Sequence, residues 1–276
     1  MTRASLRAFE DPEAHQAIAA IIRRRSTHPE DVREVLLRGL DLGSARDILD
    51  LGCGFGFMAE AIAPRAAADA HFLGADACPA NATPFLHRIA EAADSGDGRF
   101  PSAQFSALIV DSTLPWTDAS FDLVVCSYSL YFFPDVLSEI ARVLRPDGLL
   151  LTLTHSERSF VEMLRAAGLD AESSPLMALV RRFSAENAST QLSRHFAQVE
   201  RVEYPNRLRF GPGEIGEAVT YLCFKLPLLC APARSEEGRM AEVAASIAEW
   251  VRTRGELLVT KDDAGFRCRG PRRGSR

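Results

Sequence analysis

Short apolar runs alternate with stretches of helical periodicity between residues 47 and 155, and this alternation restricts the fold more than any other feature of the chain. The runs DILDL, FLGAD, FSALIVD, FDLVVCS and LLLTLTH each contain five to seven residues, and stretches such as FMAEAIAPRAAA and ATPFLHRIAEAA separate them. Apolar strands of this length with helices between them are typical of a parallel sheet that is covered on both faces. The sequence therefore predicts an open α/β fold.

Composition and charge exclude several classes of protein. Hydrophobic residues make up 47% of the 276 residues and charged residues 25%, as in an ordinary globular protein. The formal net charge is −5, and five of the 32 basic residues lie between Arg267 and Arg276, so the rest of the chain is more acidic still. Proteins that bind nucleic-acid phosphates usually carry the opposite charge. We therefore expect no nucleic-acid partner.

Cysteine spacing and hydropathy limit the metal content and the compartment. The six cysteines form no CxxC pair and show no metal-ligand spacing, so no metal site is predicted. No uncharged apolar run reaches the ~20 residues that a membrane helix needs. We expect a cytoplasmic protein with reduced thiols and no membrane partner.

Glycines follow the first predicted strand, at the edge where open α/β sheets bind ligands. The segment DLGCGFG covers residues 50–56. Glycines at alternate positions allow a tight turn and a close approach of the backbone to a ligand, and the helix that follows directs its amide dipoles toward negative groups. A dinucleotide-binding loop would have glycine where this chain has Phe57. The loop therefore indicates a small-ligand site and disfavours an NAD(P) oxidoreductase.

Acidic side chains are predicted at the ends of the first three strands. Asp50 lies in the first strand, Asp76 ends the second, and Asp111 ends the third. Such carboxylates suit a ligand with a cationic amino-acid part, ribose hydroxyls and an exocyclic adenine amine, and S-adenosylmethionine has all three. Each aspartate alone could also cap a helix or a turn, but three such caps beside a glycine loop are a less common arrangement.

With these motifs in place, residues 45–155 resemble class I S-adenosylmethionine-dependent methyltransferases, and more narrowly the UbiE/Coq5-like, methyltransferase type 11 group that acts on small molecules. The segments that carry the resemblance are ILDLGCGFGF, GAD, VDSTLPWTDASFDLVVCSYSLYFFPD and RVLRPDGLLLTLTH. The resemblance implies a Rossmann-like sheet of seven strands, mostly parallel with an antiparallel last strand, and helices on both faces. It also implies S-adenosyl-L-methionine as cofactor and S-adenosyl-L-homocysteine as product.

The resemblance further implies a cofactor site at four successive strand ends. The glycine loop would line the methionine part, Asp76 would bind the ribose hydroxyls, and Asp111 would bind the adenine edge. Ser127, which ends the fourth strand, would lie near the methyl group. The implied cofactor residues are Asp50, Gly52, Cys53, Gly54, Asp76, Ala77, Cys78, Asp111, Ser112, Thr113 and Ser127.

Three residues near the ends of the predicted fourth and fifth strands are candidates for acceptor chemistry. His155 closes the fifth strand and is the best placed histidine for a general base, although a capping role would place it there equally well. Tyr128 and Tyr131 could orient an acceptor or present aromatic faces to the sulfonium. Several relatives have a histidine directly after this tyrosine, but here Phe132 follows Tyr131. The weaker candidates are His15, His28, His195 and Glu157.

The acceptor is predicted to be a small, partly apolar organic molecule, because SYSLYFFPD and AVTYLCFKLPLLCAP are apolar segments that we expect near the site. Methyl transfer would require mainly alignment for in-line displacement, with a base only where the nucleophile must lose a proton. The alternatives are methylation of protein or RNA, cofactor binding without transfer and, more weakly, aminopropyl transfer. The sequence does not distinguish a monomer from a homodimer.

We expect a single domain over the whole chain, because no repeat, low-complexity block or long linker interrupts it. Asp11 is predicted to cap the first helix, and Thr27 with Glu30 to form a capping box for a second helix that stops near Gly43. Residues Asp262 to Gly265 are predicted to form the turn of a hairpin. The predicted parts are N-terminal helices (1–45), a cofactor-binding core (46–155), a substrate-side cover (156–230), a closing helix and hairpin (231–268) and a basic tail (269–276).

Overall fold

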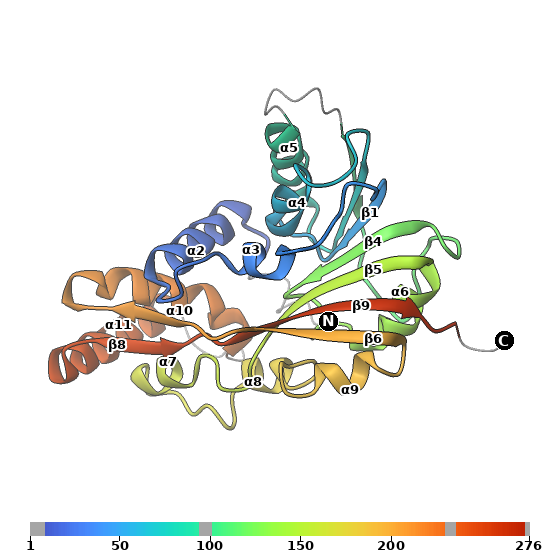
Figure 1. Ribbon diagram of the computed structural model, residues 1–276. Helices are drawn as coiled ribbons and strands as arrows, with labels where there is room; N and C mark the ends of the chain where they lie inside the picture. Colours follow the sequence, from blue (N-terminus) through green and yellow to red (C-terminus); the bar gives the residue numbers. More distant parts are fainter. Residues whose placement is uncertain (1–8, 94–100, 230–235, 274–276) are drawn as a thin grey trace.

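A seven-stranded sheet forms the centre of the computed structural model, which describes residues 9–93, 101–229 and 236–273. Its strands are β1 (Asp47–Leu51), β2 (His71–Asp76), β3 (Ser102–Ala107), β4 (Phe121–Ser127), β5 (Leu144–His155), β6 (Phe196–Tyr204) and β9 (Asp263–Pro271). The strand order is β3-β2-β1-β4-β5-β9-β6 (Figure 1). The first five strands pair in parallel, and β9, the last strand of the chain, runs antiparallel to both β5 and β6. This topology confirms the predicted Rossmann-like fold.

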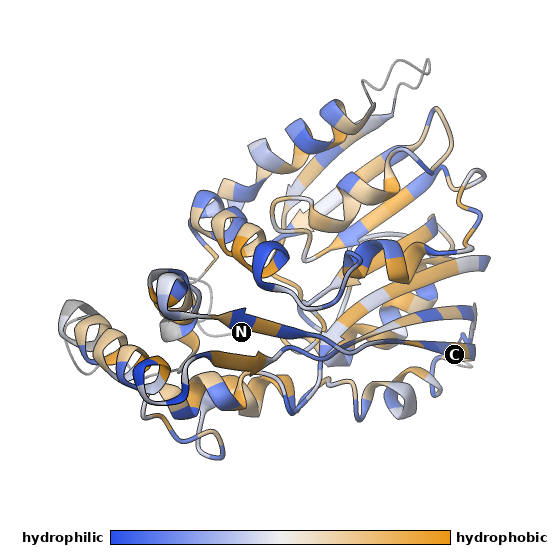
Figure 2. Ribbon diagram, turned by 60° about the vertical axis from the view of Figure 1, so that its left-hand side comes forward, coloured by the Kyte–Doolittle hydropathy of each residue, from blue (hydrophilic) through white to orange (hydrophobic). Residues whose placement is uncertain are grey.

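Helices cover both faces of the sheet, because successive residues of each buried strand point to opposite sides. The covering helices are α3 (Val32–Leu37), α4 (Phe57–Ile62) and α5 (Ala82–Ala93) on one face and α6 (Leu137–Val143) and α9 (Ala188–Leu192) on the other. Ile48 of β1 packs with the first group, whereas Leu49 and Leu51 pack with the second. Figure 2 shows the resulting run of hydrophobic residues along the central strands.

A two-stranded sheet and its helices lie beside the carboxyl end of β5 (Figure 1). They bury a common apolar cluster that is separate from the two clusters of the large sheet. Several of its elements fall in the segment 156–230, for which a substrate-side cover was predicted. Its elements are α2 (Pro12–Arg25), α7 (Val161–Ala166), α8 (Pro175–Val180), β7 (Arg207–Phe210), α10 (Ile215–Leu229), α11 (Glu236–Arg254) and β8 (Leu257–Thr260).

The predicted hairpin around Asp262 to Gly265 is wrong. Strand β8 pairs with β7 in the small sheet and β9 pairs with β5 and β6 in the large one, so the chain passes from one sheet into the other without turning back. Asn206 fixes this crossing, because its backbone carbonyl accepts from Lys261 N at 2.9 Å and its N–H donates to Asp262 Oδ1 at 3.0 Å. Residues typical of a turn here connect two different sheets.

The first helix begins as predicted, but the second does not. The side chain of Asp11 caps α2. The predicted capping box of Thr27 and Glu30 is wrong, because Thr27 N donates to Arg207 O at 2.8 Å and so extends the edge of the small sheet. Asp31 caps α3 instead, and that helix ends well before the predicted glycine stop.

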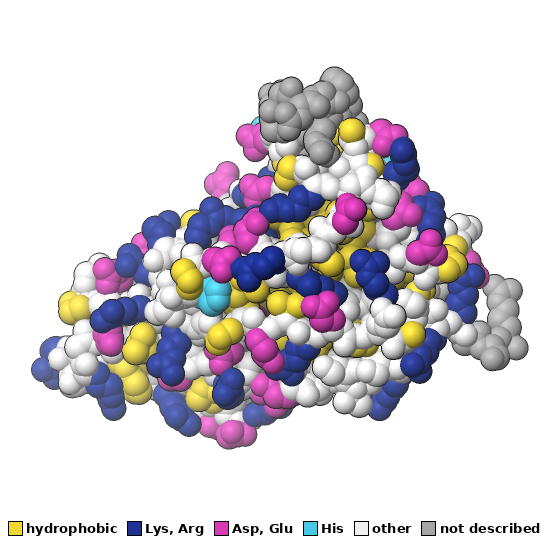
Figure 3. Space-filling view, viewed as in Figure 1, with side chains coloured by type: hydrophobic (Ala, Val, Ile, Leu, Met, Phe, Trp, Pro, Cys, Tyr) yellow, Lys and Arg dark blue, Asp and Glu magenta, His cyan; other side chains and the backbone are white. Residues whose placement is uncertain are grey.

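Charged side chains of both signs are interspersed over the face shown in Figure 3. Several pairs connect elements that are distant in the sequence. Arg25 pairs with Glu217 at 2.6 Å and ties α2 to α10, and Arg33 pairs with Glu60 at 2.7 Å and ties α3 to α4. In the part of the chain that the structure describes, no helix combines the length and the hydropathy needed to cross a membrane.

Candidate active site

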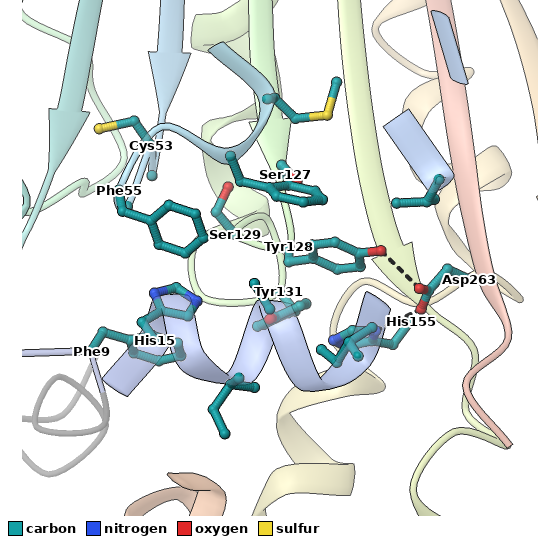
Figure 4. A pocket seen from close by; sticks show the side chains of 18 of the residues that line it. Phe9, His15, Cys53, Phe55, Ser127, Tyr128, Ser129, Tyr131, His155 and Asp263 are labelled. Atoms are coloured by element: carbon teal, nitrogen blue, oxygen red, sulfur yellow. Dashed lines mark hydrogen bonds and ion pairs between the residues drawn. The ribbon is translucent and has the colours of Figure 1, made fainter. Parts of the chain in front are cut away.

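One cavity of about 460 Å³ extends from the carboxyl end of β1 to the connection between β8 and β9. Side chains of α2 and α10 line it together with residues at the strand ends (Figure 4). The structure therefore brings most of the predicted site residues to one place. The predicted residues that line the cavity are Asp50, Gly52, Cys53, Gly54, Asp76, Ala77, Cys78, Ser127, Tyr128, Tyr131 and His155.

The loop after β1 is folded tightly against its neighbours. Gly52 has a φ of +74°, and a Cβ at this position would lie 2.5 Å from the Cβ of Ser129. A side chain therefore does not fit without moving the loop that follows β4. Gly52 N donates to Ala75 O at 2.7 Å, and Gly54 N donates to Asp76 Oδ2 at 2.9 Å. The loop is thus held against the end of β2.

Asp76 ends β2, as predicted, and joins the glycine loop to the turn that follows. Besides the bond from Gly54, its Oδ1 accepts from Cys78 N at 2.8 Å and from Asn81 Nδ2 at 3.2 Å. Because a carboxylate offers about four lone-pair positions, the fixed Asp76 can still accept from the hydroxyl groups of a ligand. Asn81, which the sequence did not indicate as a site residue, is fully buried in the wall of the cavity.

Asp50 is buried in β1 next to the glycine loop, with 2% of its surface exposed. Neither carboxylate oxygen accepts a hydrogen bond of normal geometry from residues 9–93, 101–229 and 236–273. Burial and, to a lesser degree, the charge of Asp76 raise the pKa of Asp50 to about 8, against a smaller opposing effect of the nearby Ala59 N–H. A buried acid without a partner is costly, and a cationic group of a ligand would relieve that cost.

The third predicted carboxylate lies outside the cavity. Strand β3 ends at Ala107, opposite Asp76, because its neighbour β2 ends there and offers no further partner. The prediction that Asp111 ends the third strand is therefore wrong. Its carboxylate accepts from the next backbone N–H at 2.8 Å, and Asp111, Ser112 and Thr113 are exposed and do not line the cavity.

A buried charged cluster occupies the other end of the cavity (Figure 4). Asp263, the first residue of β9, accepts from His155 Nδ1 at 2.7 Å through Oδ1 and from Tyr128 OH at 2.7 Å through Oδ2. Its Oδ2 also accepts from Lys261 Nζ at 2.5 Å. The pairing of β5 with β9 sets His155 opposite Asp263 and so brings these groups together.

The cluster fixes the protonation of His155. Burial, followed by the charge of Lys261, lowers the pKa of His155 to about 4, so its ring is neutral near pH 7. Because Asp263 accepts from Nδ1, that nitrogen carries the proton and Nε2 keeps its lone pair. Nε2 makes no hydrogen bond to any residue that the structure describes. A neutral imidazole that is oriented through Nδ1 and free at Nε2 has the geometry of a general base, while its lowered pKa makes it a weak proton acceptor.

The carboxylate of Asp263 stays ionised in this buried place. Burial alone would raise its pKa, but the charge of Lys261 and the contact with His155 hold the pKa below its ordinary value. Tyr128 and Tyr131 stack on the same imidazole, with ring centroids 4.6 Å and 5.9 Å from it. Burial raises the pKa of both hydroxyls above the ordinary range, so the two tyrosines remain neutral. The two tyrosine rings position His155 and line the cavity.

Of the weaker candidates, His15 and His28 line the cavity, whereas His195 and Glu157 do not. His15 of α2 stacks on Phe224 of α10, with ring centroids 5.3 Å apart, and so joins two of the elements that enclose the cavity. Its Nδ1 is buried and lacks a hydrogen-bond partner within the described chain. No sequence motif indicated this placement.

The charged residues that line the cavity include three at the end that holds His155 that were not predicted as site residues: Asp263, Lys261 and Lys225. In the sequence, Asp263 belongs to a stretch that is typical of a turn, and Lys225 only interrupts an apolar run. One signal could have pointed to the lysines. Only two of the chain's 32 basic residues are lysine, and both line this cavity.

A mostly parallel α/β sheet, with a glycine loop after β1 and an acidic residue at the end of β2, defines the class of Rossmann-like proteins that bind a nucleoside cofactor at the strand ends. Residues 49–152 match a family model described as a methyltransferase domain. These residues are therefore similar to a methyltransferase domain, in agreement with the resemblance that residues 45–155 show.

Individual relatives agree with this assignment. The nocamycin O-methyltransferase of Saccharothrix syringae is 37% identical over 131 residues, which cover 45% of this chain and 44% of that protein. The demethylmenaquinone methyltransferase of Lactobacillus johnsonii is 31% identical over 121 residues, which cover 42% and 46%. The match thus spans less than half the length of these curated relatives. The solved structure of YcgJ from Bacillus subtilis, at 16% identity, superimposes with a TM-score of 0.52 and covers 95% of this chain and 100% of that chain, so the two share the fold.

Proposed function

We propose that the chain binds S-adenosylmethionine at the glycine-loop end of the cavity and transfers its methyl group to a small, partly apolar organic acceptor at the other end. The observation that carries this proposal is the continuity of the cavity. It joins the loop of Gly52 and the unpartnered carboxylate of Asp50 to the free Nε2 of His155. Methyl transfer needs the two reactants side by side in one space, and the family of the domain supports this chemistry.

The residues at the glycine-loop end fit the cofactor. Asp50 would pair with its ammonium group, Asp76 would accept from the ribose hydroxyls, and Ala77 and Cys78 would lie beside the adenine. Asp111 is left out of the proposed contacts, because it is exposed outside the cavity. The bound sulfonium supplies a methyl carbon that is already activated.

His155 would take a proton from the acceptor at Nε2 where the nucleophile is a hydroxyl or an acidic carbon. Asp263 would hold the ring through Nδ1 and stabilise the imidazolium that forms. Burial, followed by the charge of Lys261, keeps the ring neutral near pH 7. An acceptor whose nucleophile is already anionic would need only the positioning that the cavity walls provide.

The proposed acceptor is small and partly apolar because of the side chains around the acceptor end. The nocamycin relative is named as an O-methyltransferase, which favours an oxygen nucleophile. We include neither nucleic acid nor a membrane among the proposed partners. The apolar residues that line the cavity include Ile18, Ile22, Phe132, Leu176, Phe224 and Leu228.

Isothermal titration with S-adenosylmethionine, S-adenosylhomocysteine and NADH tests the cofactor half of the proposal. Asp76→Ala should weaken the binding of both adenosyl ligands by about 10-fold or more, because charge-assisted hydrogen bonds are lost. Asp111→Ala is the matched control, an aspartate after the neighbouring strand that lies outside the cavity, and it should change the affinity little. A preference for NADH would refute the cofactor assignment. Tight binding of the adenosyl ligands without transfer to any member of a broad panel of phenols, acids and amines would instead favour a cofactor-binding protein that transfers no methyl group.

A further inference from the structure

Lys225 of α10 lines the cavity with its ammonium group among aromatic rings. Its Nζ lies 4.8 Å from the ring centroid of Phe160, 5.4 Å from that of Tyr221 and 6.0 Å from that of Phe224. It makes no hydrogen bond or ion pair with any residue that the structure describes. Aromatic faces offset only part of the cost of removing a cation from water. The surroundings of Lys225 are therefore electrostatically incomplete.

The neighbouring charges do not balance Lys225. The carboxylate of Asp263 already accepts from His155, Tyr128 and Lys261. Since His155 is neutral, this end of the cavity holds two lysines against one carboxylate. Partial removal from water, followed by repulsion from Lys261, lowers the pKa of Lys225 to about 7, as expected for a cation without a counter-ion.

The choice of lysine at these two positions is informative, because the chain otherwise uses arginine for every basic side chain. The surface pairs of this protein use the planar guanidinium, as in Arg252 with Glu249. Lysine instead presents a compact point charge that tolerates burial by shifting its pKa. Both lysines line this one cavity, which indicates a need for compact ammonium groups there.

We propose that the acceptor carries a carboxylate or an equally acidic oxygen, and that this anion pairs with Lys225 Nζ. The inference rests on the proposed function, because it identifies the acceptor class of the same site. Phe160, the ring nearest to Lys225, packs edge-on against His155 with centroids 4.9 Å apart, so the ammonium lies on the acceptor side. The carboxylate of the cofactor's methionine part is the other source of the same chemistry.

Calorimetric titration with matched acids and amides, at saturating S-adenosylhomocysteine, tests the proposal. The probes are 3-phenylpropionate with 3-phenylpropionamide and 1-naphthoate with 1-naphthamide, which share a shape and differ in charge. We expect the acids to bind the parent protein about 10-fold or more tightly than the amides. The preference should vanish in Lys225→Met and persist in part in Lys225→Arg, which keeps the charge. Equal binding of acids and amides by the parent, or an unchanged preference in Lys225→Met, would overturn the proposal.

The two-lysine composition also allows a direct spectroscopic test on the parent protein. Expression with lysine labelled with ¹³C at Cε gives a spectrum with one signal from each lysine, and Lys225→Arg assigns the two. In the presence of S-adenosylhomocysteine, either acid should move the Lys225 signal, and the matched amide should leave it in place. A Lys225 signal that does not move at millimolar acid would overturn the proposal even if Lys225→Met fails to fold.

The affinity for S-adenosylhomocysteine separates the two sources of the anion. We expect equal affinity in the parent and in Lys225→Met. A loss of about 10-fold in Lys225→Met, without any preference for acids, would assign the anion to the cofactor and overturn the assignment to the acceptor. Failure of the parent to bind S-adenosylhomocysteine would refute the proposed function. If an acid still moves the Lys225 signal when no S-adenosylhomocysteine is present, that shift would support the anion site independently.

Discussion

The cavity contains two buried aspartates, one at each end, and their surroundings are opposite. Asp50 is 2% exposed and has no hydrogen-bond partner in the described chain, whereas Asp263 is 3% exposed and accepts from His155, Tyr128 and Lys261. Burial raises the pKa of Asp50 to about 8, while its partners hold the pKa of Asp263 below the ordinary value. We infer from this difference that the proposed cofactor end is left incomplete for a ligand, whereas the proposed acceptor end carries counter-charges of its own.

The largest expected effect comes from removing the paired carboxylate. Asp263→Asn leaves Lys261 buried without its counter-ion, and breaking a buried pair in this way costs about 3–5 kcal/mol of the free energy of unfolding. Urea unfolding monitored by circular dichroism measures the loss. Asp111→Asn, at an exposed aspartate outside the cavity, is the control and should be close to neutral. A loss for Asp263→Asn no larger than that of the control would mean that the protein gains no stability from this cluster.

Removing the unpartnered carboxylate should have the opposite sign. Asp50→Asn should raise the free energy of unfolding of the ligand-free protein by about 2 kcal/mol at pH 7, because the neutral amide avoids about half of the cost that the raised pKa represents. The folded state holds a proton on Asp50 that the unfolded chain has lost between about pH 4 and pH 8. The parent therefore loses stability as the pH rises through this range, and the gain in Asp50→Asn should increase with it.

Urea unfolding of the parent and Asp50→Asn at several pH values provides this measurement. The same variant should bind S-adenosylhomocysteine about 10-fold more weakly, since the pair with the ammonium group is lost. A variant that is more stable than the parent but binds S-adenosylhomocysteine more weakly would establish that Asp50 contributes to ligand binding and lowers the stability of the ligand-free protein. A variant that is less stable than the parent at every pH would show instead that Asp50 has a structural partner in solution.

The cofactor end could be predicted because its residues follow strands that are adjacent in both sequence and sheet. Gly52, Gly54 and Asp76 stand directly after or at the end of β1 and β2, and the ends of neighbouring parallel strands share one edge. Asp111 is the exception, and the reason is physical. The apolar run FSALIVD continues past Ala107, but β3 ends there with its partner strand, so Asp111 does not lie at the strand end where it was predicted.

The acceptor end could not be predicted in the same way. His155 and Asp263 are 108 residues apart in the chain and meet only through the antiparallel pairing of β9 with β5. The sequence around Lys261 and Asp263 is typical of a solvated turn, and local patterns do not reveal that it connects two sheets. Of this cluster, His155 and Tyr128 were proposed as site residues, since each lies at or next to the end of a readable strand. Lys261 and Asp263 were not, because their contact with His155 depends on the register of distant strands.

The glycine loop allows a test of how closely the backbone is packed at the cofactor end. Gly52 and Gly39 both have a φ of +74°, but a Cβ at Gly52 would lie 2.5 Å from Ser129, whereas a Cβ at Gly39 meets nothing within 4 Å. Gly39→Ala should show the cost of the backbone conformation alone. Gly52→Ala should lower the free energy of unfolding by about 2 kcal/mol more, because it adds a steric clash, and should also weaken S-adenosylhomocysteine binding. Equal losses in the two variants, measured by urea unfolding, would show that the loop relaxes without strain.

The smallest expected effect concerns two tyrosine hydroxyls near the acceptor end. Tyr128 OH donates to Asp263 Oδ2 at 2.7 Å, whereas Tyr221 OH is buried and has no partner among the residues described. Tyr128→Phe should cost about 1 kcal/mol, since it removes one of the three groups that hold the charge of Asp263. Tyr221→Phe removes a hydroxyl that is buried without compensation and should be neutral or slightly stabilising. Thermal unfolding of both variants at pH 7 compares them directly, because each loses only one oxygen atom. If both variants lose the same stability, the bond to Asp263 contributes nothing beyond the packing of the ring, and the acceptor end is held by Lys261 and His155 alone.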